Sequence, residues 1–115
     1  MSGIEVINRA IAAGEKMGLR ALAPLELTIF AIAEAEVYCD KDGIDALIRR
    51  YGSDSLPVFA NAFTEIGAME VAASLSALGE TGVTPEHLLS AANDLITGRV
   101  GYSYENIVTY VEARI

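Results

Sequence analysis

Two glutamates stand out at the end of the most apolar stretch of the chain. Glu34 and Glu36 follow a run of apolar residues that begins after Glu26, and Tyr38 comes two residues later. An enzyme active site or a ligand pocket needs a cleft that holds a buried carboxylate with a perturbed pKa. The sequence therefore offers Glu34, Glu36 and Tyr38 as a candidate pocket of a small enzyme or ligand-binding domain.

The same region lacks the residues that a metal site requires. Di-metal sites in helical bundles use Glu-x-x-His pairs, and the only histidine, His87, does not follow either glutamate at that spacing. The stretch from Asp40 to Asp45 is spaced like the start of a calcium loop. Its twelfth position is Tyr51, which cannot act as the bidentate carboxylate of such a loop. We expect no bound metal.

The remaining reactive side chains have no partner nearby in the sequence. His87 falls in the first turn of an expected helix, and no nucleophile lies close to it. A general base must reach the proton it abstracts, so this histidine alone indicates no catalysis. Cys39 lies between Tyr38 and Asp40, where negative charge disfavours a thiolate. We therefore interpret Cys39 as structural and expect no catalytic residue and no cofactor.

The charge of the chain points to a different class of function. Sixteen acidic residues stand against eight basic ones, a net charge of -8. Residues 1–33 are balanced, so the excess lies beyond them, and residues 55–78 contain no base at all. Such a chain cannot supply the clustered basic surface of a nucleic-acid-binding protein, and it repels anionic lipid. We expect a protein partner, in particular a basic nucleic-acid-binding one, and no direct binding to nucleic acid or membrane.

Helical signals dominate the pattern of apolar residues. The spacing predicts helical segments over about residues 2–17, 24–38, 44–51, 55–66, 68–78 and 85–98, and a last one after Ser103. Thr84 is the expected cap of the 85–98 segment, and Ser103 that of the last one. Gly67 is either a break or a close helix contact, while Gly79 and Gly82 are expected to bracket a loop. We predict an all-α fold, a single compact domain over residues 1–115, with about six helices, because Gly67 leaves open whether residues 55–66 and 68–78 are one helix or two.

The segment from Pro24 to Tyr38 is apolar on nearly all sides, which is typical of a central, buried helix. The other helices are expected to pack around it. The side chains that we expect to be largely buried are Leu25, Phe30, Ile32, Phe59, Phe63, Ile66, Leu89 and Val108. The chain shows no basic segment followed by a long apolar run, and one cysteine cannot form an internal disulfide, so we expect a cytoplasmic protein.

Three short motifs resemble a known family. They are Glu36-Val37-Tyr38, Asp42-Gly43-Ile44 and the stretch from Ala62 to Ala68. Over roughly residues 25–80 the chain is similar to a small all-α family of domains of unknown function that includes a bacterial DNA-mimic protein. The resemblance implies the all-α fold and a surface that imitates nucleic acid. The chain departs from the family at a paired glycine, which is Asp42-Gly43 here, and at residues 46–51, which replace an aromatic pair and add two arginines.

These observations favour a non-enzymatic acidic module that binds a protein partner, with DNA mimicry as its most specific form. A mimic places carboxylates at spacings that imitate phosphates and so occupies a basic site. The candidate partner-binding residues are Asp40, Asp42, Asp45, Asp54, Glu65 and Glu70. The alternatives are the enzyme or ligand-binding domain described above, and an acidic helical protein whose charge serves only solubility.

Self-association is a further expectation. Hydrophobic residues make up 52% of the chain, a high share for so few residues. In the last helix, Tyr110 falls away from the apolar face that contains Ile107 and Val111. Because exposed aromatic side chains are enriched at interfaces, we expect a homodimer.

Overall fold

Seven α-helices and two short 3₁₀ turns form the protein in a computed structural model that describes residues 2–81 and 85–115. The elements are α1 (Gly3–Met17), η1 (Leu19–Ala21), α2 (Pro24–Lys41), α3 (Ile44–Tyr51), η2 (Ser53–Ser55), α4 (Leu56–Glu65), α5 (Met69–Thr81), α6 (Glu86–Thr97) and α7 (Tyr104–Glu112). No strand occurs in the described residues, and the all-α prediction is confirmed. The expected count of about six is corrected to seven. Gly67 adopts φ 81°, a left-handed conformation that separates α4 from α5.

The helix ends follow from local chemistry. The Ser2 hydroxyl accepts a hydrogen bond from the Glu5 amide at 3.2 Å, and Pro24 begins α2, where its missing N–H costs little. Two ends differ from the sequence prediction. α2 continues to Lys41, three residues beyond the expected end, and α5 includes Gly79, which was expected in a loop. The expected loop glycine at 82 and the helix cap at Thr84 lie outside the described residues.

The first turn of α3 is capped by a side chain from a distant helix. Gly43 precedes α3 with φ 95° and has no side chain that could accept a hydrogen bond. Asn93 of α6 fills this role, because its Oδ1 accepts a hydrogen bond from the Ile44 amide at 3.0 Å. The bond joins residues 49 positions apart, so it also fastens α3 to α6.

Replacing Asn93 with alanine is expected to lower the free energy of unfolding by about 1 kcal/mol, because the Ile44 amide loses its cap. Asn93→Asp keeps an oxygen acceptor at the helix N-terminus, so it is expected to retain most of the stability. Urea denaturation of the two variants makes the comparison. Equal losses in both would contradict the proposed role of the Oδ1 acceptor, because aspartate keeps that oxygen and nearly the same shape.

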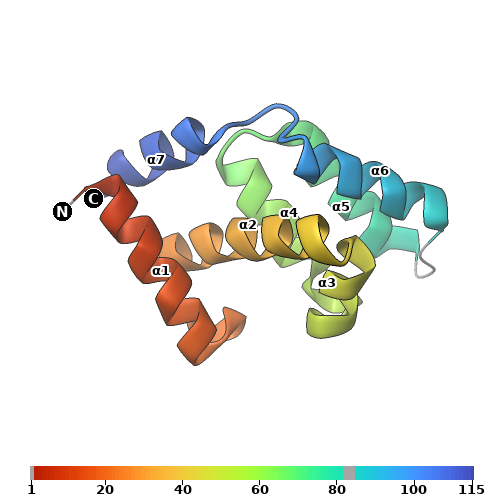
Figure 1. The fold of residues 1–115 in the computed structure, drawn as a ribbon, viewed down its shortest axis with the longest axis horizontal. Coiled ribbons are helices and arrows are strands. Elements are labelled where there is room, and N and C mark those ends of the chain that lie inside the picture. Colours follow the sequence, from red (N-terminus) through yellow and green to blue (C-terminus); the bar gives the residue numbers. More distant parts are fainter. Residues whose placement is uncertain (1, 82–84) are drawn as a thin grey trace.

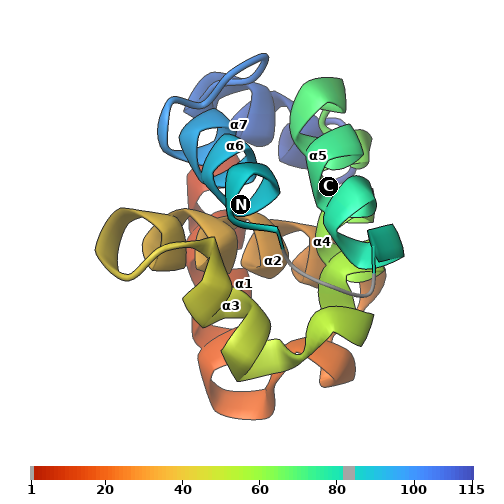
Figure 2. The same ribbon diagram turned by 90° about the vertical axis from the view of Figure 1, so that its right-hand side faces the viewer.

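α2 runs across the molecule between α1 and α3. α2 contacts α1, α3, α4 and α6, while α4 packs on α5, α5 on α6, and α1 on α7. Figures 1 and 2 show α5 and α6 side by side, and α7 beside the start of α1. The Cα radius of gyration is 13.3 Å, as expected for one compact globule of this length.

The core draws on every α-helix. Four of the eight side chains expected in it are buried: Phe30, Ile32, Phe59 and Phe63. The other four, Leu25, Ile66, Leu89 and Val108, pack against the core but are only half-buried. Those four lie on helices or helix ends at the edge of the packing, where one flank of the side chain meets solvent. No helix in the described part of the chain is both long and apolar enough to cross a membrane.

α1 approaches α2 closely at a glycine. Gly14 is buried, and a Cβ atom at this position would overlap the ring of Phe30. The absence of a side chain at Gly14 therefore makes room for the Phe30 ring, which is only 2% exposed. The spacing between these two helices depends on this pair.

Candidate functional site

The two glutamates that stand out in the sequence lie on different sides of α2. Residues two apart on an α-helix are separated by about 200° around its axis. Glu34 accordingly faces α3, where its Oε2 accepts a hydrogen bond from the Tyr51 hydroxyl at 2.6 Å. Glu36 faces the segment between α6 and α7. The candidate pocket of Glu34, Glu36 and Tyr38 is thus divided between two places.

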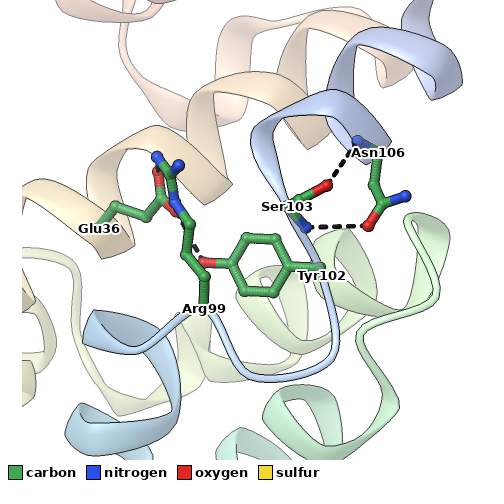
Figure 3. A network of polar contacts seen from close by, with 5 residues as sticks. All are labelled: Glu36, Arg99, Tyr102, Ser103 and Asn106. Carbon is green, nitrogen blue, oxygen red and sulfur yellow. Dashed lines mark hydrogen bonds and ion pairs between the residues drawn. The ribbon is translucent and has the colours of Figure 1, made fainter.

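Glu36 is the acceptor for two residues of the α6–α7 connection (Figure 3). Its Oε2 accepts hydrogen bonds from Arg99 Nε at 2.8 Å and from the Tyr102 hydroxyl at 2.7 Å, and its Oε1 accepts from the second arginine nitrogen at 3.2 Å. Arg99 adopts φ 46°, which is unusual for a residue with a side chain. Burial, and then the hydrogen bond to Glu36, raise the pKa of Tyr102 well above its ordinary value. Glu36 therefore fastens the C-terminal segment to α2.

The segment after Tyr102 is ordered by a capping box. The Ser103 hydroxyl accepts from the Asn106 amide at 3.2 Å, and Asn106 Oδ1 accepts from the Ser103 amide at 2.9 Å (Figure 3). These reciprocal bonds start α7 at Tyr104, as the sequence predicted for Ser103. The Glu36 contacts and the capping box together fix where α7 begins.

Glu34 and Tyr38 do share a groove. It has a volume of about 440 Å³ and lies between the end of α1, α2 and the end of α3, with Arg50 and Tyr51 also in its lining. Tyr51 packs edge-on against Tyr38 and Phe59, at ring-centroid distances of 6.4 and 5.6 Å. Burial raises the pKa of Tyr51 above its ordinary value, and the hydrogen bond to Glu34 raises it further. The Glu34 carboxylate is thereby already engaged in holding α3 on α2.

Cys39 is buried on α2. Burial raises the pKa of its thiol to about 12, and the negative charges of Asp40 and Glu36 act in the same direction. A thiol with this pKa is almost wholly protonated at neutral pH and is a poor nucleophile. Among the described residues, no group of three or more His, Cys, Asp or Glu side chains is arranged to hold a metal ion.

The six candidate partner-binding carboxylates lie in separate regions. Asp40 and Asp42 are exposed at the end of α2, Asp45 begins α3, and Asp54 lies in η2. Glu65 ends α4 and Glu70 begins α5. Figures 1 and 2 both place the α2–α3 turn away from the α4–α5 turn. The structure thus brings three of them together around the α2–α3 turn and two at the α4–α5 turn.

Two of these carboxylates have an arginine partner. Arg49 donates to Asp45 at 2.7 Å, and Arg20 lies 3.6 Å from Asp54. The third ion pair in the described part of the chain is that of Arg99 with Glu36. Glu65 accepts a hydrogen bond from the Tyr110 hydroxyl at 3.4 Å. Asp40, Asp42 and Glu70 form no ion pair with the described residues.

One half of the fold carries no basic side chain. The sequence between Arg50 and Arg99 contains six acidic residues and neither lysine nor arginine. This stretch spans η2 and helices α4, α5 and α6, which pack on one another in that order. The exposed acidic side chains described in it are Asp54, Glu65, Glu70, Glu86 and Asp94. Arg20 lies beside Asp54, and the other four form no ion pair with the described residues, so they create a negative field that attracts positively charged groups.

Sequence reasoning missed the partners of the two glutamates. Tyr51, Arg99 and Tyr102 come from segments 17 to 66 positions away from their acceptors. The glycines on both sides of Arg99 signal an unusual turn, but no pattern in the sequence connects that turn to Glu36. Comparison with models of known protein families, with curated proteins and with solved structures gave no match for this chain.

Proposed function

We propose that this protein is a non-enzymatic acidic interaction module that binds a basic protein, and that it does so as a DNA mimic. The observation that carries the proposal is the segment from Arg50 to Arg99, which has exposed carboxylates and no base. A basic nucleic-acid-binding site recognises negative charge presented on a rigid surface. Helices α4 to α6 supply such a surface, and the exposed Asp40 and Asp42 extend the negative charge to the α2–α3 turn.

The carboxylates differ in what they contribute to this binding. Asp45 and Asp54 are partly neutralised by Arg49 and Arg20, so their charge attracts a partner less strongly. Asp40, Asp42 and Glu70 are exposed and form no ion pair with the described residues, and Glu65 accepts a hydrogen bond from the Tyr110 hydroxyl without forming an ion pair. We assign the larger share of the attraction to these unpaired carboxylates.

The engagement of Glu34 and Glu36 supports an interaction role over an enzymatic one. Each carboxylate accepts a hydrogen bond from a tyrosine, and Glu36 also pairs with Arg99. Neither is free to act on a substrate while these bonds hold. We infer that α2, with seven buried residues and contacts to four helices, is the central helix that keeps the acidic surface rigid.

The proposal places the module in the cytoplasm, where its single cysteine stays reduced. It also includes self-association through apolar side chains that remain exposed, among them Met69 and Ile115. Light scattering at high protein concentration measures the mass directly. A monomer mass there would remove the homodimer from the proposal and leave the acidic surface untouched.

Neutralising Asp40, Asp42, Asp45 and Asp54 together, as Asn variants, is expected to abolish capture of the basic partner from native cell extract at low salt. Capture by the unchanged protein is expected to weaken steeply with salt, because charges more than about 10 Å apart are screened at 0.1 M. Added double-stranded DNA is expected to displace the partner. With the recovered partner, the variant is expected to associate more slowly, since electrostatic steering acts on the on-rate.

A control variant removes the same number of negative charges from a different part of the surface. It carries glutamine in place of four acids on α1 and α7, namely Glu5, Glu15, Glu105 and Glu112. If the protein acts as a DNA mimic, this variant is expected to keep most of its capture of the partner. The test variant is also divided into two double variants. Neutralising Asp40 and Asp42 is expected to reduce capture more than neutralising Asp45 and Asp54, which are each paired with an arginine. Equal capture by all variants, or recovery of no basic partner at low salt, would leave solubility as the role of the charge.

A further inference from the structure

A groove of about 740 Å³ lies between the first half of α2, α4 and the last part of α7 with the residues after it. Its walls are mostly apolar and include Leu22, Leu25, Pro57, Val58 and Ala62. Small-molecule sites in proteins measure roughly 300–1,000 Å³ and combine apolar walls with a few polar groups. The groove has the size and the wall chemistry of such a site, and it lies apart from Glu34, Glu36 and Tyr38.

Thr28 places an unused hydrogen-bonding group in this groove. The residue is only 6% exposed and lines the groove from α2. No described residue forms a hydrogen bond with its hydroxyl, whereas the helical Thr64 donates to the Ala60 carbonyl at 3.0 Å. Among the described residues, every side-chain polar atom that is fully cut off from solvent has a partner, so the Thr28 hydroxyl retains some contact with the space that the residue lines. A hydroxyl in this position is free to exchange hydrogen bonds with water or with an occupant of the groove.

The charges at the rim indicate an uncharged occupant. Glu65 and Arg114 line one end of the groove and carry opposite charges. Both already interact with Tyr110: its hydroxyl donates to Glu65 at 3.4 Å, and the Arg114 guanidinium lies 3.5 Å above its ring. Since the rim has no net charge and the whole chain carries -8, an anion gains nothing on approach. A cation meets Arg114 beside Glu65, so the rim gives it no net attraction either.

We propose that this groove is a binding site for an uncharged, mainly apolar small molecule that carries one hydrogen-bonding group, with Thr28 as the residue that orients it. The apolar walls supply the affinity, because each contact removes apolar surface from water. The Thr28 hydroxyl supplies the preference for a ligand with a polar group. This site does not depend on the proposed capture of a basic protein.

The test uses N-phenyl-1-naphthylamine, an uncharged fluorescent probe whose one polar group is a secondary amine. Titration of the full chain is expected to give saturable binding of one probe per chain. Val58→Trp fills the groove and is expected to weaken binding at least about tenfold. Thr28→Val removes only the hydroxyl and is expected to weaken binding about twofold to tenfold, while Thr28→Ser keeps the hydroxyl and stays near the unchanged protein.

Two further variants keep the test decisive. Asn61→Trp covers the groove from an exposed position on α4, so it blocks binding even where Val58→Trp fails to fold. Val37→Trp adds the same side chain at an exposed position of α2 outside the groove and is expected to change nothing. Circular dichroism confirms the helical content of each variant. Binding that does not saturate, or that is equal in Asn61→Trp and Val37→Trp, overturns the proposal. The proposal is also overturned if Asn61→Trp changes the mass of the protein in solution but leaves probe binding unchanged. That result would identify a second copy of the chain as the occupant of the groove.

Discussion

Replacing Phe30 with alanine is expected to lower the free energy of unfolding by about 3–5 kcal/mol. The ring is 2% exposed and lies on α2 against α1, so its removal leaves a cavity where two helices meet. Urea denaturation followed by circular dichroism measures the loss. Val37→Ala is the matched control on the same helix, since Val37 is 47% exposed; its effect is expected to stay within about 0.5 kcal/mol. A Phe30 effect as small as that of the control would contradict the packing described above.

The close approach of Gly14 to the Phe30 ring provides a second test of this packing. In the unchanged protein Gly14→Ala is expected to destabilise by roughly 1–3 kcal/mol, because the new Cβ overlaps the Phe30 ring. With Phe30 already replaced by alanine, the same substitution meets no ring. It is then expected to be neutral or stabilising, because alanine favours a helix interior over glycine by about 1 kcal/mol. A double-mutant cycle without coupling would mean that the two residues do not share the contact.

Glu36→Ala is expected to be the second most damaging substitution, with a loss of about 2–3 kcal/mol. It removes the acceptor of three hydrogen bonds and leaves the hydroxyl of Tyr102, a residue only 6% exposed, without its partner. Glu70→Ala is the matched control, because Glu70 is exposed on α5 and forms no ion pair with the described residues. Thermal denaturation of both variants gives the comparison. Similar midpoints would show that the Glu36 contacts add no stability.

The pH dependence of stability tests the same contact between Glu36 and Tyr102. The pKa of Tyr102 is raised above its ordinary value of 10, chiefly by burial and then by its hydrogen bond to Glu36. Below pH 10 the tyrosine is protonated in both the folded and the unfolded chain, so its contribution to stability is fully present there. Above pH 10 the unfolded chain loses this proton while the folded chain keeps it, so stability is expected to fall as pH rises.

Tyr102→Phe is expected to make this alkaline decline shallower, and Tyr51, whose pKa is raised in the same direction, accounts for part of what remains. Urea midpoints between pH 8 and 11 give the slope for each protein. A decline of unchanged steepness in Tyr102→Phe would show that the Tyr102 hydroxyl is not held as the structure describes.

The sequence alone predicts most of the helices, because their signals are local. Ser2, Pro24 and Ser103 mark helix starts through their own hydrogen bonds or ring geometry, and α3 falls at its predicted bounds, Ile44–Tyr51. The sequence also determines the acidic excess and its location beyond residue 33. These properties depend on residues within one or two turns of each other, or on counting charges.

Only the tertiary structure decides what the chemically interesting side chains do. Glu34 and Glu36 are neighbours in sequence, yet helix geometry turns them to opposite sides, where each meets a tyrosine from another segment. The groove that Thr28 lines exists only because α2, α4, α7 and the residues after α7 converge. Contacts between residues 17 to 66 positions apart depend on how helices pack. Packing is a property of the whole core, and no local pattern of residue types encodes it.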